Sequence, residues 1–198
     1  MGLSFHYSGR IDSPSNLPDL IEEVVDIAEA FGWKYVVFNR QFPENSMGKP
    51  DYSHQIYGIC FTPPNCETIN ICFLSNGRMC SISHLQYFGK TEIQAESEYL
   101  YLLSVKTQYA GIEIHQFVIQ FFRYLDKKYF ADFTLNDEGE YWETNDEAIL
   151  KNNFRKYIEL TDGFVLAIET HPIQADEDIE SYFARLMQEI RQYKNRGK

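Results

Sequence analysis

The sequence predicts an α+β fold, in which a curved and mainly antiparallel sheet is followed by a short hairpin and a C-terminal helical pair. Segments in which apolar and polar residues alternate indicate strands, whereas apolar residues three and four positions apart indicate helices. The strand segments lie mostly in the first 107 residues, and three of the four long helical segments follow them. No internal repeat and no linker-like tract interrupts the 198 residues, which suits a single domain.

Each predicted element rests on its own pattern. The first helix has apolar residues at Leu17, Leu20 and Val24, and the long helix near the C-terminus starts at a cap formed by Asp146 or Asn145. In chain order the predicted elements are strand 3–8, helix 17–31, strands 33–42, 54–61, 67–74, 78–84 and 98–107, helix 112–129, a short hairpin of 131–135 and 140–142, a helix from 146 to about 169, and a helix over 176–193. The residues expected inside the last helix are Ile179, Phe183, Leu186, Met187 and Ile190.

The order β-α-β(4–5)-α of residues 1–130 resembles TATA-binding-protein-like or START-like helix-grip folds. In such folds an antiparallel sheet is covered by helices on one face. Leu100 and Leu102 share one face of strand 98–107 and lie opposite the apolar face of Leu103 and Val105. Both faces are therefore partly covered, so that strand is predicted to be central. Residues 131–198 then add an acidic hairpin and two helices. A fold analogy of this kind does not indicate a function.

The Asn-Gly pair at 76–77 lies between two apolar runs and predicts a type I′ hairpin turn. That turn would pair Phe73 with Cys80 and Cys72 with Ser81. Because the faces of a strand alternate, Cys72 and Cys80 would point to opposite sides and could not share a disulfide or a metal ion. No CxxC motif is present, so we interpret all the cysteines as structural thiols: Cys60, Cys66, Cys72 and Cys80.

The net charge of −11 restricts the classes of partner. Residues 131–198 alone hold fifteen acids against eight bases. Such a field repels the phosphates of nucleic acids and of anionic membranes, so a basic protein is the favoured partner. No apolar run approaches the roughly 20 residues of a transmembrane helix, and the N-terminus lacks the pattern of a secretory signal. We therefore predict a cytoplasmic protein.

The sharpest feature is the segment 132–147, DFTLNDEGEYWETNDE, in which acids surround two large aromatic residues. Acids in a first helical turn interact favourably with the helix dipole, which explains part of this pattern without a function. Alternatively, the segment is a contact surface, because hot spots favour Trp and Tyr and complementary charge steers a basic partner. Catalysis or metal binding is a third alternative, although the ligand spacing of a calcium loop is missing. The predicted contact residues are Asp137, Glu138, Glu140, Tyr141, Trp142 and Glu143.

A pocket between the sheet and helix 112–129 is the alternative site, and it would serve a small-molecule binder or an enzyme. There His6 could act as an acid or base, and Arg10 could bind an anion. The residues predicted to line it are His6, Tyr7, Arg10, Tyr57, His84, Tyr99, Tyr101 and His115. The sequence contains no GxGxxG, GxxxxGK, HExxH or GxSxG motif. It therefore indicates no cofactor, no metal and no catalytic residue, and it favours a binding protein over an enzyme.

Three stretches, HYSGR, TPPNCET and DEGEYWET, resemble in a diffuse way a family of uncharacterised bacterial proteins. That family has no known activity, so the resemblance implies no site residues. An acidic α+β protein with exposed aromatic residues is also similar, more loosely, to the immunity proteins that neutralise basic bacterial toxins. The predicted function is a non-catalytic, acidic protein-binding module.

Overall fold

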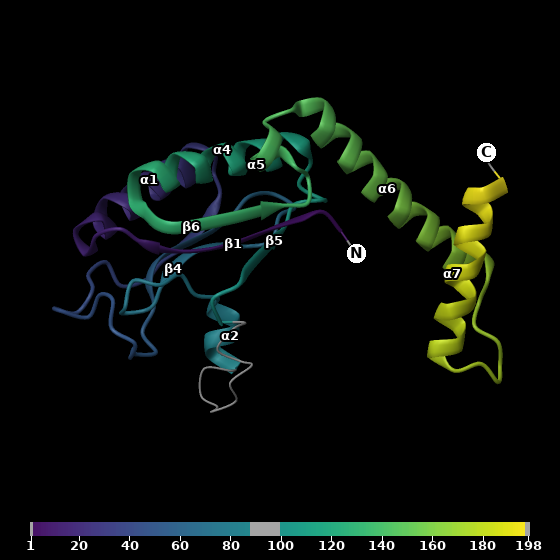
Figure 1. The fold of residues 1–198 in the computed structure, drawn as a ribbon, viewed down its shortest axis with the longest axis horizontal. Coiled ribbons are helices and arrows are strands. Elements are labelled where there is room, and N and C mark those ends of the chain that lie inside the picture. Colours follow the sequence, from purple (N-terminus) through teal and green to yellow (C-terminus); the bar gives the residue numbers. More distant parts are fainter. Residues whose placement is uncertain (1, 88–99, 197–198) are drawn as a thin grey trace.

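The computed structural model describes residues 2–87 and 100–196. This part of the chain is α+β, as predicted, with six strands and six α-helices (Figure 1). The strands are β1 (Ser4–Ile11), β2 (Lys34–Val37), β3 (Tyr57–Thr62), β4 (Ile69–Phe73), β5 (Leu103–Lys106) and β6 (Phe130–Asp137). The helices are α1 (Leu17–Ala30), α2 (Ile82–Tyr87), α4 (Ile112–Tyr129), α5 (Tyr141–Thr144), α6 (Glu147–Thr170) and α7 (Ile179–Arg196), with a 3-10 turn at Pro14–Asn16.

The strands form two antiparallel sheets of three strands each, with the orders β5-β1-β6 and β2-β3-β4. A short segment, residues 77–80, hydrogen-bonds to both sheets. The N–H of Met79 donates to the carbonyl of Gly9 in β1, at 2.9 Å, and the N–H of Cys80 donates to the carbonyl of Cys72 in β4, also at 2.9 Å. The predicted likeness to TATA-binding-protein-like and START-like folds stays a prediction.

Aromatic side chains fill the space between the first sheet and α4, and the helices α1 and α4 lie on the same side of the sheets (Figure 1). The ring of Phe122 in α4 lies 5.6 Å from that of Phe5 and 4.8 Å from that of Tyr7, between ring centroids. Both β1 rings are buried. The predicted pocket between sheet and helix is therefore occupied by core side chains at this point.

The hairpin after β4 has a different register from the predicted one. Only Gly77 in this turn has a positive φ, of 80°, whereas a type I′ turn requires it at Asn76 too. The N–H of Leu74 donates to the carbonyl of Arg78, which closes a three-residue loop in place of a two-residue one. The shift of one residue brings Cys72 and Cys80 into direct pairing, so the prediction that they point to opposite sides is wrong.

Two further strand predictions are wrong because local hydrogen bonds favour helices. The last three residues of the predicted strand 78–84 are instead the start of α2, where the hydroxyl of Ser81 accepts from the N–H of His84 at 3.5 Å. The predicted hairpin of 131–135 and 140–142 is also absent, since β6 pairs with β1 and Tyr141–Thr144 is the helix α5. The strand β5, predicted to be central, lies at the edge of its sheet.

The helices α6 and α7 form an arm that extends away from the sheets (Figure 1). We call residues 157–189, which comprise the later part of α6, the connection and the first part of α7, the arm. Asp146 caps α6 through the N–H of Ala148, as predicted. The rings of Phe164 and Phe183 stack at 6.2 Å between the two helices. Ile179, Phe183 and Met187 were expected inside, but all three are exposed, and Ile190 lies outside the described side chains.

The hydroxyl of Tyr7 is a second connection between the two sheets. It donates to the carbonyl of Asn70 in β4 at 2.8 Å and accepts from the N–H of the same residue at 3.1 Å. Burial raises the pKa of Tyr7 far above its ordinary value, so the hydroxyl stays protonated. One buried side chain thus satisfies two backbone groups of the neighbouring sheet.

We expect Tyr7→Phe to lower the free energy of unfolding by about 1–3 kcal/mol, because it leaves two backbone groups of Asn70 without that partner. Urea denaturation followed by circular dichroism measures the change. Tyr109→Phe is the matched control, since its ring is exposed and the substitution should change the stability by less than about 0.5 kcal/mol. Equal effects of both substitutions would contradict the role of Tyr7.

Candidate functional site

The carboxylate of Asp137 organises the acidic segment. Its side chain is fully buried at the end of β6. One oxygen accepts from the N–H of Gly139 at 2.7 Å, and the other accepts from the N–H groups of Tyr141 at 2.9 Å and Trp142 at 3.2 Å. The same oxygen lies 3.1 Å from Nε2 of His115 in α4. Asp137 therefore anchors the start of α5 and joins it to α4.

The imidazole of His115 continues this contact into a network of three side chains. Its Nδ1 lies 2.7 Å from the hydroxyl of Thr107, at the end of β5. Hydroxyl, imidazole and carboxylate in series resemble the nucleophile, base and orienting group of some hydrolases. Here the side chains of Thr107, His115 and Asp137 are all sealed from solvent, so no substrate can reach the hydroxyl. We interpret the network as structural.

The pKa of Asp137 is held below its ordinary value of 3.8. Burial by itself would raise it, but the hydrogen bond and the charge interaction with His115, together with the N–H groups of Gly139 and Trp142, outweigh the effect of burial. The carboxylate is therefore charged at neutral pH. A buried charge of this kind is stable only while its partners stay in place.

The other acids of the segment also bond to backbone. Glu138 accepts from the N–H of Ser4 at 2.7 Å, and Glu143 accepts from the N–H of Asp137 at 3.2 Å. Asp137 and Tyr141, both predicted as surface contacts, are buried, which is a correction to that prediction. The carboxylates of Asp137, Glu138 and Glu143 thus stabilise the local backbone, and this role needs no partner protein.

The remaining residues of the predicted contact surface are Glu140 and Trp142. Glu140 is exposed and has a left-handed φ of 59°. Trp142 is half-buried, with its ring 5.9 Å from that of Phe133 and beneath the guanidinium of Arg123. The structure thus leaves only part of the predicted surface available to a partner.

The residues of the predicted alternative pocket are spread over several places. Tyr7, Tyr57 and His115 are buried in the core. His6 lies half-buried on the other face of β1, and Tyr99 lies outside the described residues. His84 is in α2, where Nδ1 lies 2.8 Å from the hydroxyl of Ser81. Of the predicted residues that the structure describes, Arg10 and Tyr101 are the two that lie together, in a pocket of about 230 Å³ that opens on the face of β1 opposite to Tyr7.

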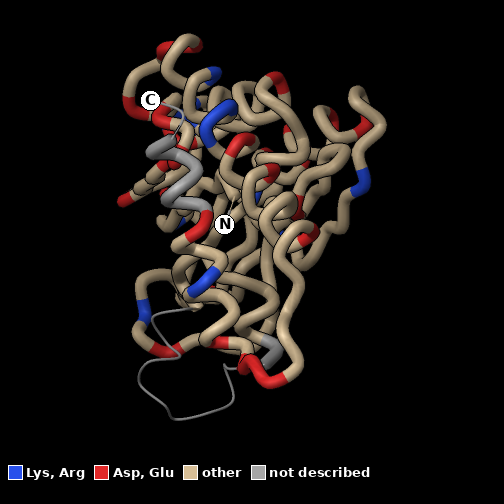
Figure 2. The backbone as a smooth tube through the Cα atoms, turned by 90° about the vertical axis from the view of Figure 1, so that its right-hand side faces the viewer, with Lys and Arg blue, Asp and Glu red and all other residues tan. Residues whose placement is uncertain are grey.

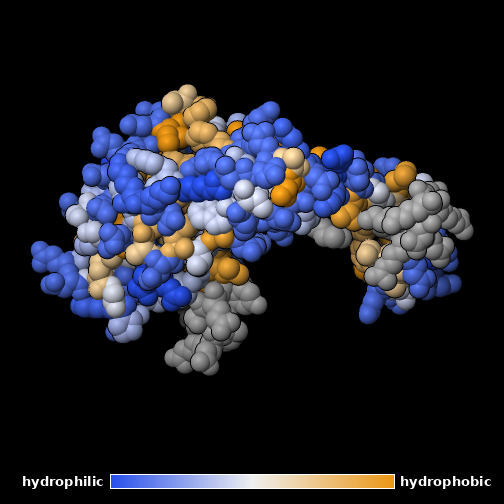
Figure 3. Space-filling model, turned by 45° about the horizontal axis from the view of Figure 1, so that its top comes forward, coloured by the Kyte–Doolittle hydropathy of each residue, from blue (hydrophilic) through white to orange (hydrophobic). Residues whose placement is uncertain are grey.

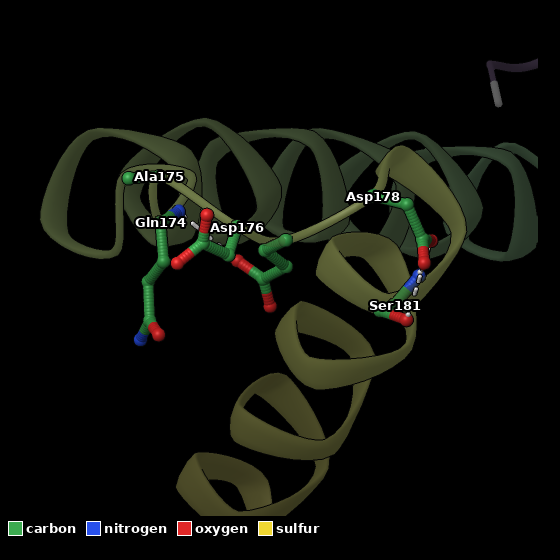
Figure 4. Close-up of a pocket in the computed structure, with 6 residues that line it drawn as sticks. Gln174, Ala175, Asp176, Asp178 and Ser181 are labelled. Carbon is green, nitrogen blue, oxygen red and sulfur yellow. Dashed lines mark hydrogen bonds between the residues drawn. The ribbon is translucent and has the colours of Figure 1, made fainter.

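A second concave surface lies on the arm, at the connection between α6 and α7. It has a volume of about 400 Å³, and Figure 4 shows the residues that line it, including Gln174, Asp176 and Asp178. Asp178 accepts from both the N–H and the hydroxyl of Ser181, at 2.8 and 3.1 Å, and thereby caps α7. Asp176 is exposed. This surface is acidic and open.

The cysteines lie in apolar surroundings. Burial raises the pKa of the Cys80 thiol to about 12 and raises that of Cys72 well above its ordinary value, so both stay protonated at neutral pH. All four cysteines are free thiols. Within residues 2–87 and 100–196, no three side chains of His, Cys, Asp or Glu are arranged to hold a metal ion.

The comparisons with known proteins give no relative. No family model matches the chain, and no curated protein and no solved structure matches it. The resemblance to uncharacterised bacterial proteins and to immunity proteins therefore stays a prediction. Among the helices of the described residues, none combines the length and apolarity that a bilayer span requires.

Sequence reasoning missed Thr107, Arg78 and Asp132 as members of these sites. A signal for the buried network existed, because His115 lies three residues before Val118 and so shares its buried face. A buried imidazole needs a polar partner. The position of Arg78 depends on the hairpin register, which the sequence pattern did not give.

We expect Asp137→Asn to lower the free energy of unfolding at pH 7 by about 3 kcal/mol, since it leaves His115 and the start of α5 without the charge. The folded pKa of Asp137 is lower than the unfolded one. Its contribution is therefore complete above the unfolded pKa and is lost as the pH falls through the folded pKa, below 3.8.

Chemical denaturation between pH 7 and pH 2 tests this expectation, and the variant should lack that part of the acid-induced loss. Asp162→Asn, at an exposed position of α6, is the control and should keep the wild-type profile. Identical profiles for wild type and Asp137→Asn would show that this carboxylate is not the group responsible.

Proposed function

We propose that the protein is a non-catalytic protein-binding module whose contact surface is the arm. The observation that carries this proposal is the run of five apolar residues at 164–168, FVLAI, within a single helix. Such a run presents apolar side chains on every side of a helix. Phe164 stacks on Phe183 of α7, and Ala167 packs with Tyr182 and Leu186. Leu166 is 58 % exposed and Val165 is 47 % exposed. Helices that are apolar on all sides are ordinarily covered on all sides.

The second helix of the arm adds a regular apolar stripe. Ile179, Phe183 and Met187 are spaced four residues apart, so they lie along one side of α7. Ile179 is 68 % exposed. Figure 3 shows hydrophobic side chains on the surface of this part of the molecule. A stripe of this spacing is typical of helices that insert into the groove of a partner.

Charge indicates which kind of partner suits this surface. Asp176, Asp178 and Glu180 are exposed beside the stripe, and acidic positions outnumber basic ones along the backbone (Figure 2). A basic protein would be steered towards the arm and would complement it on contact. This proposal keeps the predicted class of function and moves the contact from residues 137–143 to the arm. Neutralisation of a basic toxin, the activity of acidic immunity proteins, fits these requirements.

A double variant, Val165→Glu together with Ile179→Glu, tests the arm and is called the arm variant. We expect it to bind the partner about 30-fold more weakly or worse, which is the loss typical of hot-spot residues. Tagged full-length protein is recovered from its native cells at low and high salt, co-purifying proteins are identified by mass spectrometry, and the affinity is then measured with the purified partner. Binding should be weaker at high salt.

Val36→Glu is the matched control for this experiment, because Val36 is 55 % exposed but lies on β2, away from the arm. It should leave binding unchanged. A partner that binds the arm variant and the wild type equally well would contradict the proposal. So would a change from dimer to monomer in the arm variant, measured by light scattering, since it would identify a second copy of the chain as the occupant.

A further inference from the structure

Two arginine side chains are held next to each other on the outer face of the sheet. Arg10 in β1 and Arg78 form an isolated antiparallel bridge. The flanking hydrogen bonds run from Ile11 to Gly77 and from Met79 to Gly9, so the two arginines are a pair without mutual hydrogen bonds. In such pairs the side chains are closest. Like charges that oppose each other across strands are destabilising.

No carboxylate of the described residues lies close enough to either arginine to offset this repulsion with an ion pair. Within the described residues neither guanidinium forms an ion pair, although the chain has 29 acids and 18 bases. The guanidinium of Arg78 lies over the ring of Tyr101, 3.6 Å from its centroid. This contact fixes one of the two cations in position. The arrangement leaves donors of both arginines available to an external anion.

The pocket that contains both arginines has room for a small ligand. Its volume of about 230 Å³ is below the roughly 300–1,000 Å³ of sites for drug-sized molecules. Guanidinium groups present planar pairs of donors that match phosphate oxygens, and two of them balance a dianion. Burial raises the pKa of Tyr101, so its hydroxyl keeps the proton and can donate as well.

Asp132 on β6 also lines this pocket, and its φ of 53° is unusual for a residue other than glycine. Strained backbone of this kind is concentrated at functional sites. A carboxylate repels a bare phosphate but accepts a hydrogen bond from a hydroxyl group. A ligand that carries both a phosphate and a hydroxyl therefore uses Arg10, Arg78 and Asp132 together.

We propose that this pocket binds a small phosphate monoester that carries a free hydroxyl group, with Arg10 and Arg78 on the phosphate and Asp132 on the hydroxyl. The site shares no residue with the arm and does not depend on the protein-binding function.

Thermal unfolding of the full chain, titrated with inorganic phosphate and with glycerol 3-phosphate at constant ionic strength, tests the arginines. We expect both ligands to raise the melting temperature of the wild type. Arg10→Gln and Arg78→Gln should each weaken binding by about tenfold or more, the loss of one charge-assisted hydrogen bond. Without ligand, Arg10→Gln should melt at or above the wild-type temperature, because the repulsion is relieved.

Arg40→Gln is the matched control, since Arg40 lines another concave surface without a second arginine. It should keep the response to both ligands. The proposal is overturned if phosphate has no effect on the wild type, or if Arg10→Gln and Arg78→Gln respond as the wild type does. Destabilisation of unliganded Arg10→Gln would also count against it, because the pair would then be structural.

The role of Asp132 has a separate test. In the wild type, glycerol 3-phosphate should bind more tightly than inorganic phosphate, because only the ester offers hydroxyl donors. Asp132→Asn should bind inorganic phosphate more tightly, since a like charge is removed, and should lose most of the preference for the ester. An unchanged preference in Asp132→Asn would remove Asp132 from the site.

Discussion

The buried charge of Asp137 is the constraint on which the C-terminal half of the molecule depends. Its carboxylate ties β6 to the start of α5 and, through His115, to α4 and the end of β5. The position of Gly139 follows from it, since a Cβ there would lie 3.0 Å from Nε2 of His115 and 2.7 Å from the side chain of Leu150 in α6. The first turns of α6, which lead into the arm, therefore pack directly beside the network of this carboxylate.

Acidic and basic residues are used in different ways in this chain. Asp137, Glu138 and Glu143 accept hydrogen bonds from backbone N–H groups. The acidic segment therefore mainly stabilises the sharp turn between β6 and α5. The hydrogen bonds that these carboxylates accept from the backbone offset the cost of removing their charges from water. Arg10 and Arg78 do the reverse, because two like charges oppose each other across the strands and, in the described part of the chain, neither forms an ion pair. Uncompensated cost of this kind is the stronger indication of a ligand, since selection for stability alone would remove it.

Periodicity predicted the helices well, because a helix is specified by neighbours three and four residues apart. The prediction of a helix over 112–129 matches α4, and Asp146 caps α6 as expected. Register and long-range pairing were not accessible in the same way. A loop of three residues instead of two reverses which cysteines share a face, and the contact of His115 with Asp137 joins residues 22 positions apart. The sequence predicts a surface at the aromatic residues of the acidic segment, and the prediction is wrong for the buried Tyr141 because composition does not distinguish a buried tyrosine from an exposed one.

The arm and the arginine pocket both connect to strand β6, but ligand binding at one is not expected to change binding at the other. Asp132 lines the pocket and Asp137 fixes the corner, and β6 carries both. Five residues of extended strand separate them by about 16 Å, and sites further apart than about 10 Å with no shared partner act additively. β6 is also paired with β1 along its length, so neither end can shift alone. A change at the pocket therefore alters anion binding while leaving the apolar stripe of α7 in place, and the two surfaces can be assigned to separate ligands.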